Sequence, residues 1–245
     1  MIRAGYATRA PSRLQRVLGA WLLAAASAAA FAAPRVPDTM EERVRACTAC
    51  HGEEGRATSD GYYPRIAGKP AGYLYNQLVN FRDGRRRNPM MAYLVGNLPD
   101  AYLREIAVHF ANLHPPYPPP AAASVPAPVL ERGRELVTRG DKARDVPACT
   151  ACHGDALTGV APAVPGLLGL PRDYVNSQFG AWRIGARHAA APDCMAEIAR
   201  RMSADDVSAA AAYLAAQPVP QNAAPAPASR AKPPLDCGSI STAKP

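Results

Sequence analysis

The chain has 245 residues, with 28 Lys and Arg against 20 Asp and Glu, which gives a formal net charge of +8 at pH 7. The first 32 residues hold four arginines and no acid, so the remainder carries only +4. That modest charge, without a basic stripe interleaved with aromatic residues, predicts no nucleic-acid partner. The 213 residues after the first 32 are enough for two small domains.

The N-terminus has the pattern of a secretory signal peptide over residues 1–32. A basic stretch precedes an apolar run over residues 17–30, and the small residues Ala30 and Ala32 mark a cleavage site before Ala33. The run is shorter than the ~20 residues that a membrane-spanning helix needs. Export to the periplasm is the prediction, and a signal peptide kept uncleaved as an anchor is the alternative. Peripheral association with a membrane is a further partner interpretation.

Helical patterns follow one another through the rest of the chain. Asp38 and Glu41 form an N-cap signal, and Ser203 begins the last helix. No run alternates between apolar and polar residues as a strand would, so the fold class predicted is all-α. The expected helices run from the N-cap into Cys47 and over residues 72–81, 99–113, 129–137, 173–182 and 204–216.

Proline-rich stretches divide these helices into two groups. Residues 115–128 hold seven prolines and no charge, which is typical of a semi-rigid linker. A first domain over residues 33–114 and a second over 129–217 are therefore predicted, with a Pro/Ala-rich tail over 218–245.

The pentapeptide Cys-Thr-Ala-Cys-His occurs once in each domain, at residues 47–51 and 149–153. Cys-x-x-Cys-His is the attachment signal for c-type haem. Residues three and four apart share a helix face, so two thiols can reach one porphyrin while the histidine reaches the iron. A zinc site or a redox dithiol is the alternative. Two copies in an exported chain favour two covalently bound haem c groups, on Cys47, Cys50, Cys149 and Cys152, with His51 and His153 as axial ligands.

The two halves also repeat each other around these motifs. Positions separated by 101 residues match in order: Pro64 with Pro165, Tyr73 with Tyr174, and Arg82 with Arg183. Such ordered correspondence indicates an internal duplication.

The second axial ligand of each iron decides its chemistry, because methionine gives a high-potential carrier and an open position gives catalysis or gas binding. Met91 and Met195 each lie eight residues before the start of a closing helix, at Pro99 and Ser203. That shared offset favours Met91 over Met90, although core packing is an alternative role for either methionine.

These motifs, with the segments at residues 73–84 and 89–91, give a chain that resembles a dihaem cytochrome c of the cytochrome c4 type, built from two tandem class I cytochrome c domains. The resemblance implies His/Met ligation at both irons. It implies that the Pro64 and Pro165 carbonyls accept the Nδ1–H of the ligand histidines, a contact that orients the ring. It also makes four residues candidate contacts of the haem propionates: Tyr73, Arg82, Tyr174 and Arg183.

Two further features stand outside the haem motifs. Cys194 and Cys237 are left over, and in an oxidising compartment they predict a disulfide. Cys194 has an alternative role, since some thiosulfate-oxidising dihaem enzymes resemble this chain and ligate an iron through cysteine. The basic turn at residues 85–87 is interpreted as a solvated turn, with a docking patch for an acidic partner as the alternative.

The function predicted is single-electron transport without bond breaking. The resemblance implies a quinol–cytochrome c oxidoreductase as donor and a terminal oxidase as acceptor. The alternatives are a haem enzyme of the thiosulfate-oxidising type and the cytochrome subunit of a periplasmic dehydrogenase.

Overall fold

The computed structural model describes residues 12–17, 21, 36–123, 125–228 and 232–241. Most of the predicted signal peptide, including its cleavage site, lies outside these residues. The chain divides into two units, residues 1–42 and 43–245, and the second unit contains both haem motifs. Among the described residues, no helix combines the length and apolar character that crossing a membrane requires.

The first half of the chain is helical, as expected. Thr39, directly after the predicted Asp38, accepts a hydrogen bond from the amide of Glu42 at 3.4 Å and so caps the first turn of the helix that follows. The elements are α2 (Met40–Arg43), α3 (Arg45–His51), the 3-10 turn η1 (Glu53–Gly55), α4 (Ala71–Arg82), α5 (Pro89–Val95) and α6 (Asp100–Ala111).

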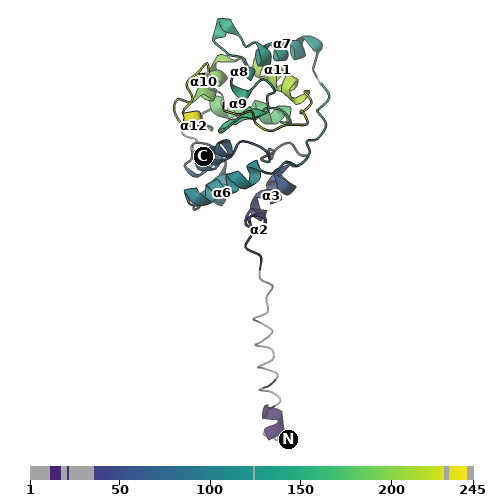
Figure 1. Ribbon diagram of the computed structural model, residues 1–245, viewed down its shortest axis with the longest axis vertical. Helices are drawn as coiled ribbons and strands as arrows, with labels where there is room; N and C mark the ends of the chain where they lie inside the picture. The colour runs from purple at the N-terminus through teal and green to yellow at the C-terminus, as the bar shows by residue number, and fades with distance from the viewer. Residues whose placement is uncertain (1–11, 18–20, 22–35, 124, 229–231, 242–245) are drawn as a thin grey trace, which may run out of the picture. The chain divides into compact units, whose positions relative to one another are not determined.

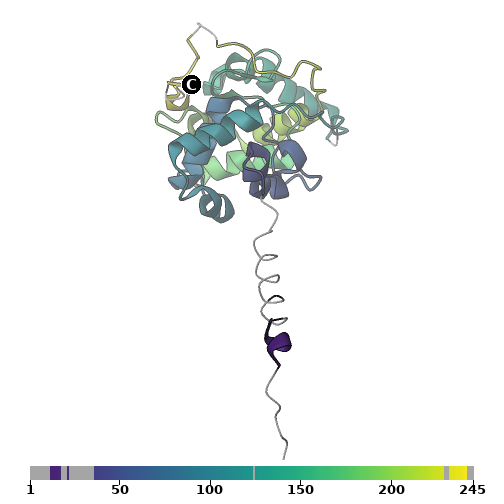
Figure 2. The same ribbon diagram turned by 60° about the horizontal axis from the view of Figure 1, so that its bottom comes forward.

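The second half repeats this order. Ser203 caps the last long helix by accepting from the amide of Asp206 at 3.0 Å, as predicted. The elements are α7 (Ala127–Thr138), η2 (Lys142–Arg144), α8 (Thr150–His153), β1 (Gly159–Val160), β2 (Val164–Pro165), α9 (Arg172–Arg183), α10 (Cys194–Arg201), α11 (Ala204–Ala215) and α12 (Gly238–Ser241). Figures 1 and 2 show the helices of the two halves side by side within residues 43–245.

A glycine determines how closely α7 and α11 pack. A Cβ on Gly133 would lie 2.1 Å from the carbonyl oxygen of Ala209 and 2.8 Å from Cβ of Tyr213. Only a residue without a side chain therefore lets the two helix backbones approach this closely. The contact covers a core that includes Leu136, Val137, Val207, Ala210 and Leu214.

Three local features of the structure go beyond the sequence patterns. The linker ends early, because α7 begins at Ala127 rather than at residue 129. A short antiparallel hairpin, β1–β2, interrupts the otherwise helical second half. The tail adds to this hairpin, since Ala226 exchanges backbone hydrogen bonds of 2.8 Å with Gly159 and Ala161.

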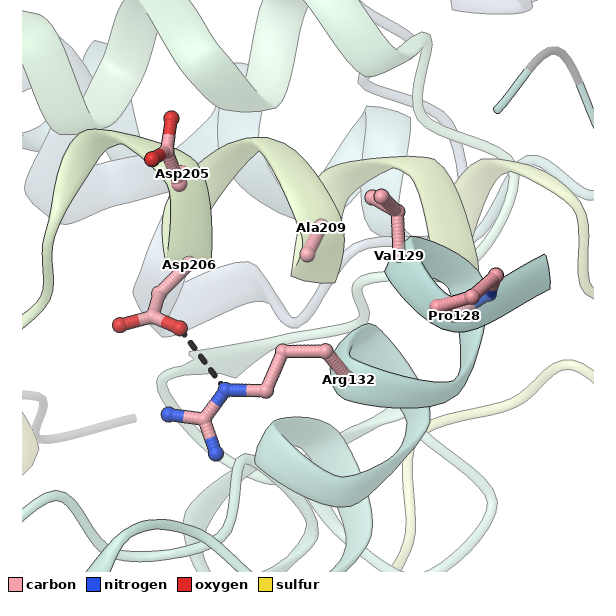
Figure 3. A pocket seen from close by; sticks show the side chains of 6 residues that line it. All are labelled: Pro128, Val129, Arg132, Asp205, Asp206 and Ala209. Carbon is pink, nitrogen blue, oxygen red and sulfur yellow. Dashed lines mark hydrogen bonds and ion pairs between the residues drawn. The ribbon is translucent and has the colours of Figure 1, made fainter. Parts of the chain in front are cut away.

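Four charged side chains join α7, η2 and α11. Arg132 donates to Asp206 at 2.9 Å and to Asp141 at 2.7 Å. Arg144 pairs with Asp206 at 2.6 Å and with Asp141 at 2.8 Å. Figure 3 shows the Arg132–Asp206 pair at a shallow surface pocket, with Asp205 turned away from it. Hydrogen bonds from Arg132 and Arg144 lower the pKa of Asp141 from 3.8 to about 2.

We expect this network to make the second domain acid-sensitive. A carboxyl whose folded pKa is depressed contributes stability above its unfolded pKa and loses that contribution as pH falls. For Asp141 the loss falls between about pH 4 and pH 2. In denaturant unfolding followed by far-UV circular dichroism, Asp141→Asn will be less stable than wild type at pH 7, and the difference will shrink across that window. Asp205→Asn, at an exposed neighbour of Asp206, serves as the control; a pH-independent difference for Asp141→Asn would contradict the prediction.

Candidate haem centres

The first motif lies on a short helix that ends in its buried histidine. Helix α3 places Cys47, Cys50 and His51 within two turns, and His51 is 9% exposed. Nδ1 of His51 lies 2.8 Å from the carbonyl oxygen of Pro64, which accepts its proton. Gly52, at φ +77°, ends the helix where a Cβ would clash with the carbonyl of Ala57. The ring is held through Nδ1, so its Nε2 lone pair is available to a metal.

The second motif repeats this arrangement. Helix α8 carries Cys152 and His153, Cys149 precedes it, and His153 is 8% exposed. Nδ1 of His153 lies 2.7 Å from the carbonyl oxygen of Pro165. Both prolines therefore lie where the resemblance places them.

Burial keeps both imidazoles neutral, as a metal ligand must be. Desolvation lowers the pKa of His51; the Pro64 hydrogen bond opposes this, and the charge of Arg86 lowers it further. Desolvation likewise lowers the pKa of His153, opposed by the Pro165 hydrogen bond and reinforced by the charge of Lys69.

The candidate methionines lie on two short helices that the sequence patterns did not predict. On α5, Met90 is 59% exposed, whereas Met91 is partly buried against the core of Phe81, Val95 and Leu103. Met195 is partly buried on the first turn of α10. Burial therefore favours Met91 over Met90 as the side chain that reaches the iron of the first haem.

The caps of these helices show that the repeat is not exact here. Asn88 caps the amide of Met91 at 3.0 Å, whereas Asp193 caps the amide of Ala196 at 3.1 Å. Counted from the N-caps, Met195 corresponds to Met90; counted from the following helices, it corresponds to Met91. The N-caps Asn88 and Pro99 are 11 residues apart, whereas Asp193 and Ser203 are 10 apart, so the second half is one residue shorter here. The shorter connection after α10 accounts for the shift.

The structure joins Cys194 to Cys237 in a disulfide across 43 residues. The bond attaches the C-terminal tail to the first turn of α10, and Asn76 of α4 donates to the carbonyl of Ser239 at 2.9 Å. A disulfide sulfur has no thiolate to offer an iron, so the structure does not favour Cys194 as an axial ligand. The other four cysteines, all in the haem motifs, are unpaired.

The arginines predicted to contact propionates are used elsewhere. Arg82 donates to Asp100 at 2.6 Å, and Arg183 donates to the carbonyl oxygens of Ala199 and Met202 at 2.9 and 2.6 Å. These protein acceptors fix the guanidinium of Arg82 at the N-terminal end of α6 and that of Arg183 at the C-terminal end of α10. A neighbouring pair of arginines offers a further set of candidate donors.

That pair is Arg86 and Arg187, which lie at the interface of the two halves. Arg86 donates to Gln77 at 2.9 Å, to Gln178 at 2.8 Å and to the hydroxyl of Tyr174 at 3.1 Å. Arg187 donates to Gln178 at 2.7 Å and to Gln77 at 3.2 Å. Each arginine thus bonds one glutamine from each half, in a pseudo-twofold arrangement.

The basic turn at residues 85–87 is consequently not a solvated turn or docking patch at Arg86. Its backbone pairs with the second half: Arg87 donates to the carbonyl of Ala186 at 2.8 Å, and His188 donates to that of Arg85 at 2.6 Å. Arg187 is 6% exposed and stacks 3.9 Å from the ring of Trp182. The shared offset of 101 between Arg86 and Arg187 was the sequence signal for this pair.

The interface fits a group that carries carboxylates. Burial lowers the pKa of Arg187 and the charge of Arg86 lowers it further, while Tyr73 and Tyr174 oppose this. Among the described residues, neither Arg86 nor Arg187 is paired with a carboxylate; their side-chain acceptors are Gln77, Gln178 and Tyr174. The indole N–H of Trp182 is buried without an acceptor. A partly buried set of donors without a carboxylate partner suits bidentate binding of carboxylates, and the two propionates of haem c are carboxylates.

Comparisons with known proteins agree with this geometry. No family model matches the chain. The chain is 35% identical over 209 residues to the thiosulfate dehydrogenase electron acceptor of Thiomonas intermedia, covering 84% of this chain and 93% of that one. It is 32% identical over 177 residues to cytochrome c4 of Pseudomonas aeruginosa, covering 71% and 85%. The solved thiosulfate dehydrogenase TsdBA of Marichromatium purpuratum superimposes with a TM-score of 0.63 at 33% identity, covering 71% of this chain and 36% of that longer one.

Two haem motifs with buried histidines, on a duplicated helical fold, define a dihaem c-type cytochrome built from class I cytochrome c domains. Its relatives are named as electron acceptors or carriers, so it transfers electrons between redox proteins and is not an enzyme. The chain belongs to the cytochrome c4 family and carries two covalently bound haem c groups.

Proposed function

We propose that this chain is an exported electron acceptor for a dehydrogenase that oxidises thiosulfate or a similar small sulfur compound, and that it delivers the electrons to a terminal oxidase. The observation that supports this donor is the 35% identity that extends over 93% of a thiosulfate dehydrogenase electron acceptor. Export agrees with the signal pattern of residues 1–32 and with the disulfide.

Each half, residues 33–114 and 129–217, holds one haem in this proposal. Cys47 and Cys50 attach the first haem, with His51 and Met91 as axial ligands. For the second haem, Cys149 and Cys152 provide the attachment, with His153 and Met195 as axial ligands. The bound haem supplies reversible one-electron chemistry at iron.

The protein's own residues then have three tasks. Pro64 and Pro165 hold the imidazole rings in a fixed orientation, which limits rearrangement between oxidation states. Burial of the histidines excludes water from the ligand positions. The Arg86–Arg187 interface, with Tyr73 and Tyr174, fixes the two halves together and supplies donors for the propionates.

A quinol–cytochrome c oxidoreductase is the second candidate donor, and the 32% identity to cytochrome c4 favours it. The two candidates separate in one stopped-flow experiment. Oxidised holoprotein is mixed either with a thiosulfate dehydrogenase and thiosulfate or with a quinol–cytochrome c oxidoreductase and reduced quinol, and reduction of the haems is followed by absorbance.

We expect reduction by the dehydrogenase within a few of its turnovers, and no reduction when thiosulfate is omitted. Fast reduction by the quinol-dependent enzyme alone would replace the proposed donor with the second candidate. Failure of both enzymes to reduce a holoprotein that dithionite reduces fully would contradict both.

A further inference from the structure

Lys69 belongs to the first half of the chain, but its amine contacts the second half. The side chain is 5% exposed, and Nζ donates to the carbonyl oxygen of Gly166 at 2.9 Å. Gly166 directly follows Pro165, whose carbonyl holds Nδ1 of His153. The ammonium group is therefore one peptide unit away from the group that orients the second haem's histidine.

The charge of Lys69 has no carboxylate to balance it among the described residues. Its charged neighbour is Arg65, which is 4% exposed, donates to the carbonyls of Pro115 and Pro116, and lies 3.8 Å above the ring of Tyr117. Burial and the charge of Arg65 lower the pKa of Lys69 to about 8, so most of the population is still charged at pH 7.

An unpaired buried charge costs stability. No structural gain offsets that cost here, because a neutral donor could make the single hydrogen bond to Gly166 equally well. The positive charge itself is what distinguishes Lys69 from such a residue.

Lys69 also breaks the symmetry of the interface. Across the repeat, Arg86 matches Arg187 and Gln77 matches Gln178, but the position that matches Lys69 is Leu170. The second half therefore has no cation at the matching position to contact the loop that carries Pro64. In agreement, the positive charge that lowers the pKa of His153 is that of Lys69 from the other half. The positive charge that lowers the pKa of His51 is that of Arg86 from its own half.

We propose that the ammonium group of Lys69 raises the reduction potential of the second haem relative to the first, and so directs the transferred electron to the second haem. A nearby positive charge favours the reduced iron, which carries one positive charge fewer, and the attraction is strong where water is excluded. The proposal rests on His153 as an axial ligand. In this proposal Lys69 acts only through its charge, which determines which of the two haems the electron occupies.

The test is a spectroelectrochemical titration of the holoprotein at pH 7. Lys69→Gln removes the charge while keeping a donor for Gly166, and Lys69→Met removes both. Lys69→Arg keeps the charge, and Lys142→Met removes an exposed lysine of the second half as a control for net charge. The Met91→Ala and Met195→Ala variants assign each potential to its haem.

For Lys69→Gln and Lys69→Met we expect the electron in half-reduced protein to shift toward the first haem by about tenfold, which is about 59 mV for a one-electron couple. Lys69→Arg and Lys142→Met will stay within about twofold of wild type. The proposal would be overturned if the distribution of the electron between the two haems were unchanged in both neutral variants. It would also be overturned if the reduction potentials of both haems fell equally. Either outcome would leave two low-spin centres in place and so would not affect the proposed electron-carrier function. If one neutral variant fails to bind haem, the other decides the result.

Discussion

The Met195→Ala holoprotein will bind carbon monoxide at one of its two irons, and the sulfur-to-iron charge-transfer band at the red end of its visible spectrum will lose about half its intensity. Met195 is partly buried on α10, and no neighbouring thiolate can replace it because Cys194 is in a disulfide. Loss of the thioether also lowers the potential of that haem by a few hundred millivolts, a fraction of the ~0.8 V over which axial ligands move haem potentials.

The first haem offers a matched pair of variants. Met91→Ala will open the first iron in the same way, whereas Met90→Ala will leave the spectrum and the potential unchanged because Met90 is 59% exposed. Carbon monoxide binding by Met90→Ala instead of Met91→Ala would show that the ligand follows the position counted from the N-cap. Unchanged spectra in all three variants would exclude methionine ligation.

Gly133→Ala will destabilise the second domain by about 3 kcal/mol, at the upper end of the cost of overpacking. The new Cβ would lie 2.1 Å from the backbone oxygen of Ala209, which no rotamer change can move away. Helices α7 and α11 must then separate, which disrupts the core formed by Leu136 and Leu214. Denaturant unfolding of the holoprotein, followed by circular dichroism, measures the effect.

Gly180→Ala is the control for this change. Gly180 lies within α9, and its Cβ would meet nothing within 4 Å. Alanine should therefore stabilise the protein by up to about 1 kcal/mol through helix propensity alone. Equal stability changes in the two variants would show that the α7–α11 contact does not depend on the size of residue 133.

The sequence was sufficient for features that depend on residue order. The haem motifs, the 101-residue repeat and the long helices could be predicted because each is a local pattern of spacing or periodicity. Helices α5 and α10 could not, because seven and eight residues are too few to show a period. The spacing from the N-cap of each to the N-cap of the next helix also differs by one residue, 11 against 10, and this is why offsets alone do not determine which methionine corresponds to Met195.

The residues between the two halves were the other feature that the sequence could not predict. Arg86 looked like one member of a basic turn, and only its contacts with Gln77 and Gln178 reveal that it joins the two halves. Lys69 had no sequence signal, because its counterpart is Leu170 and its acceptor is a backbone carbonyl 97 residues away. Such contacts depend on how the two halves pack, which residue spacing does not encode.

Addition of carbon monoxide to the dithionite-reduced wild-type holoprotein tests most directly whether a histidine and a methionine occupy both axial positions at each iron. We predict that the haem absorption bands will not shift at either centre on the timescale of mixing. Rapid formation of a carbonyl complex at even one haem would contradict this coordination, and with it the assignment of Met91 and Met195.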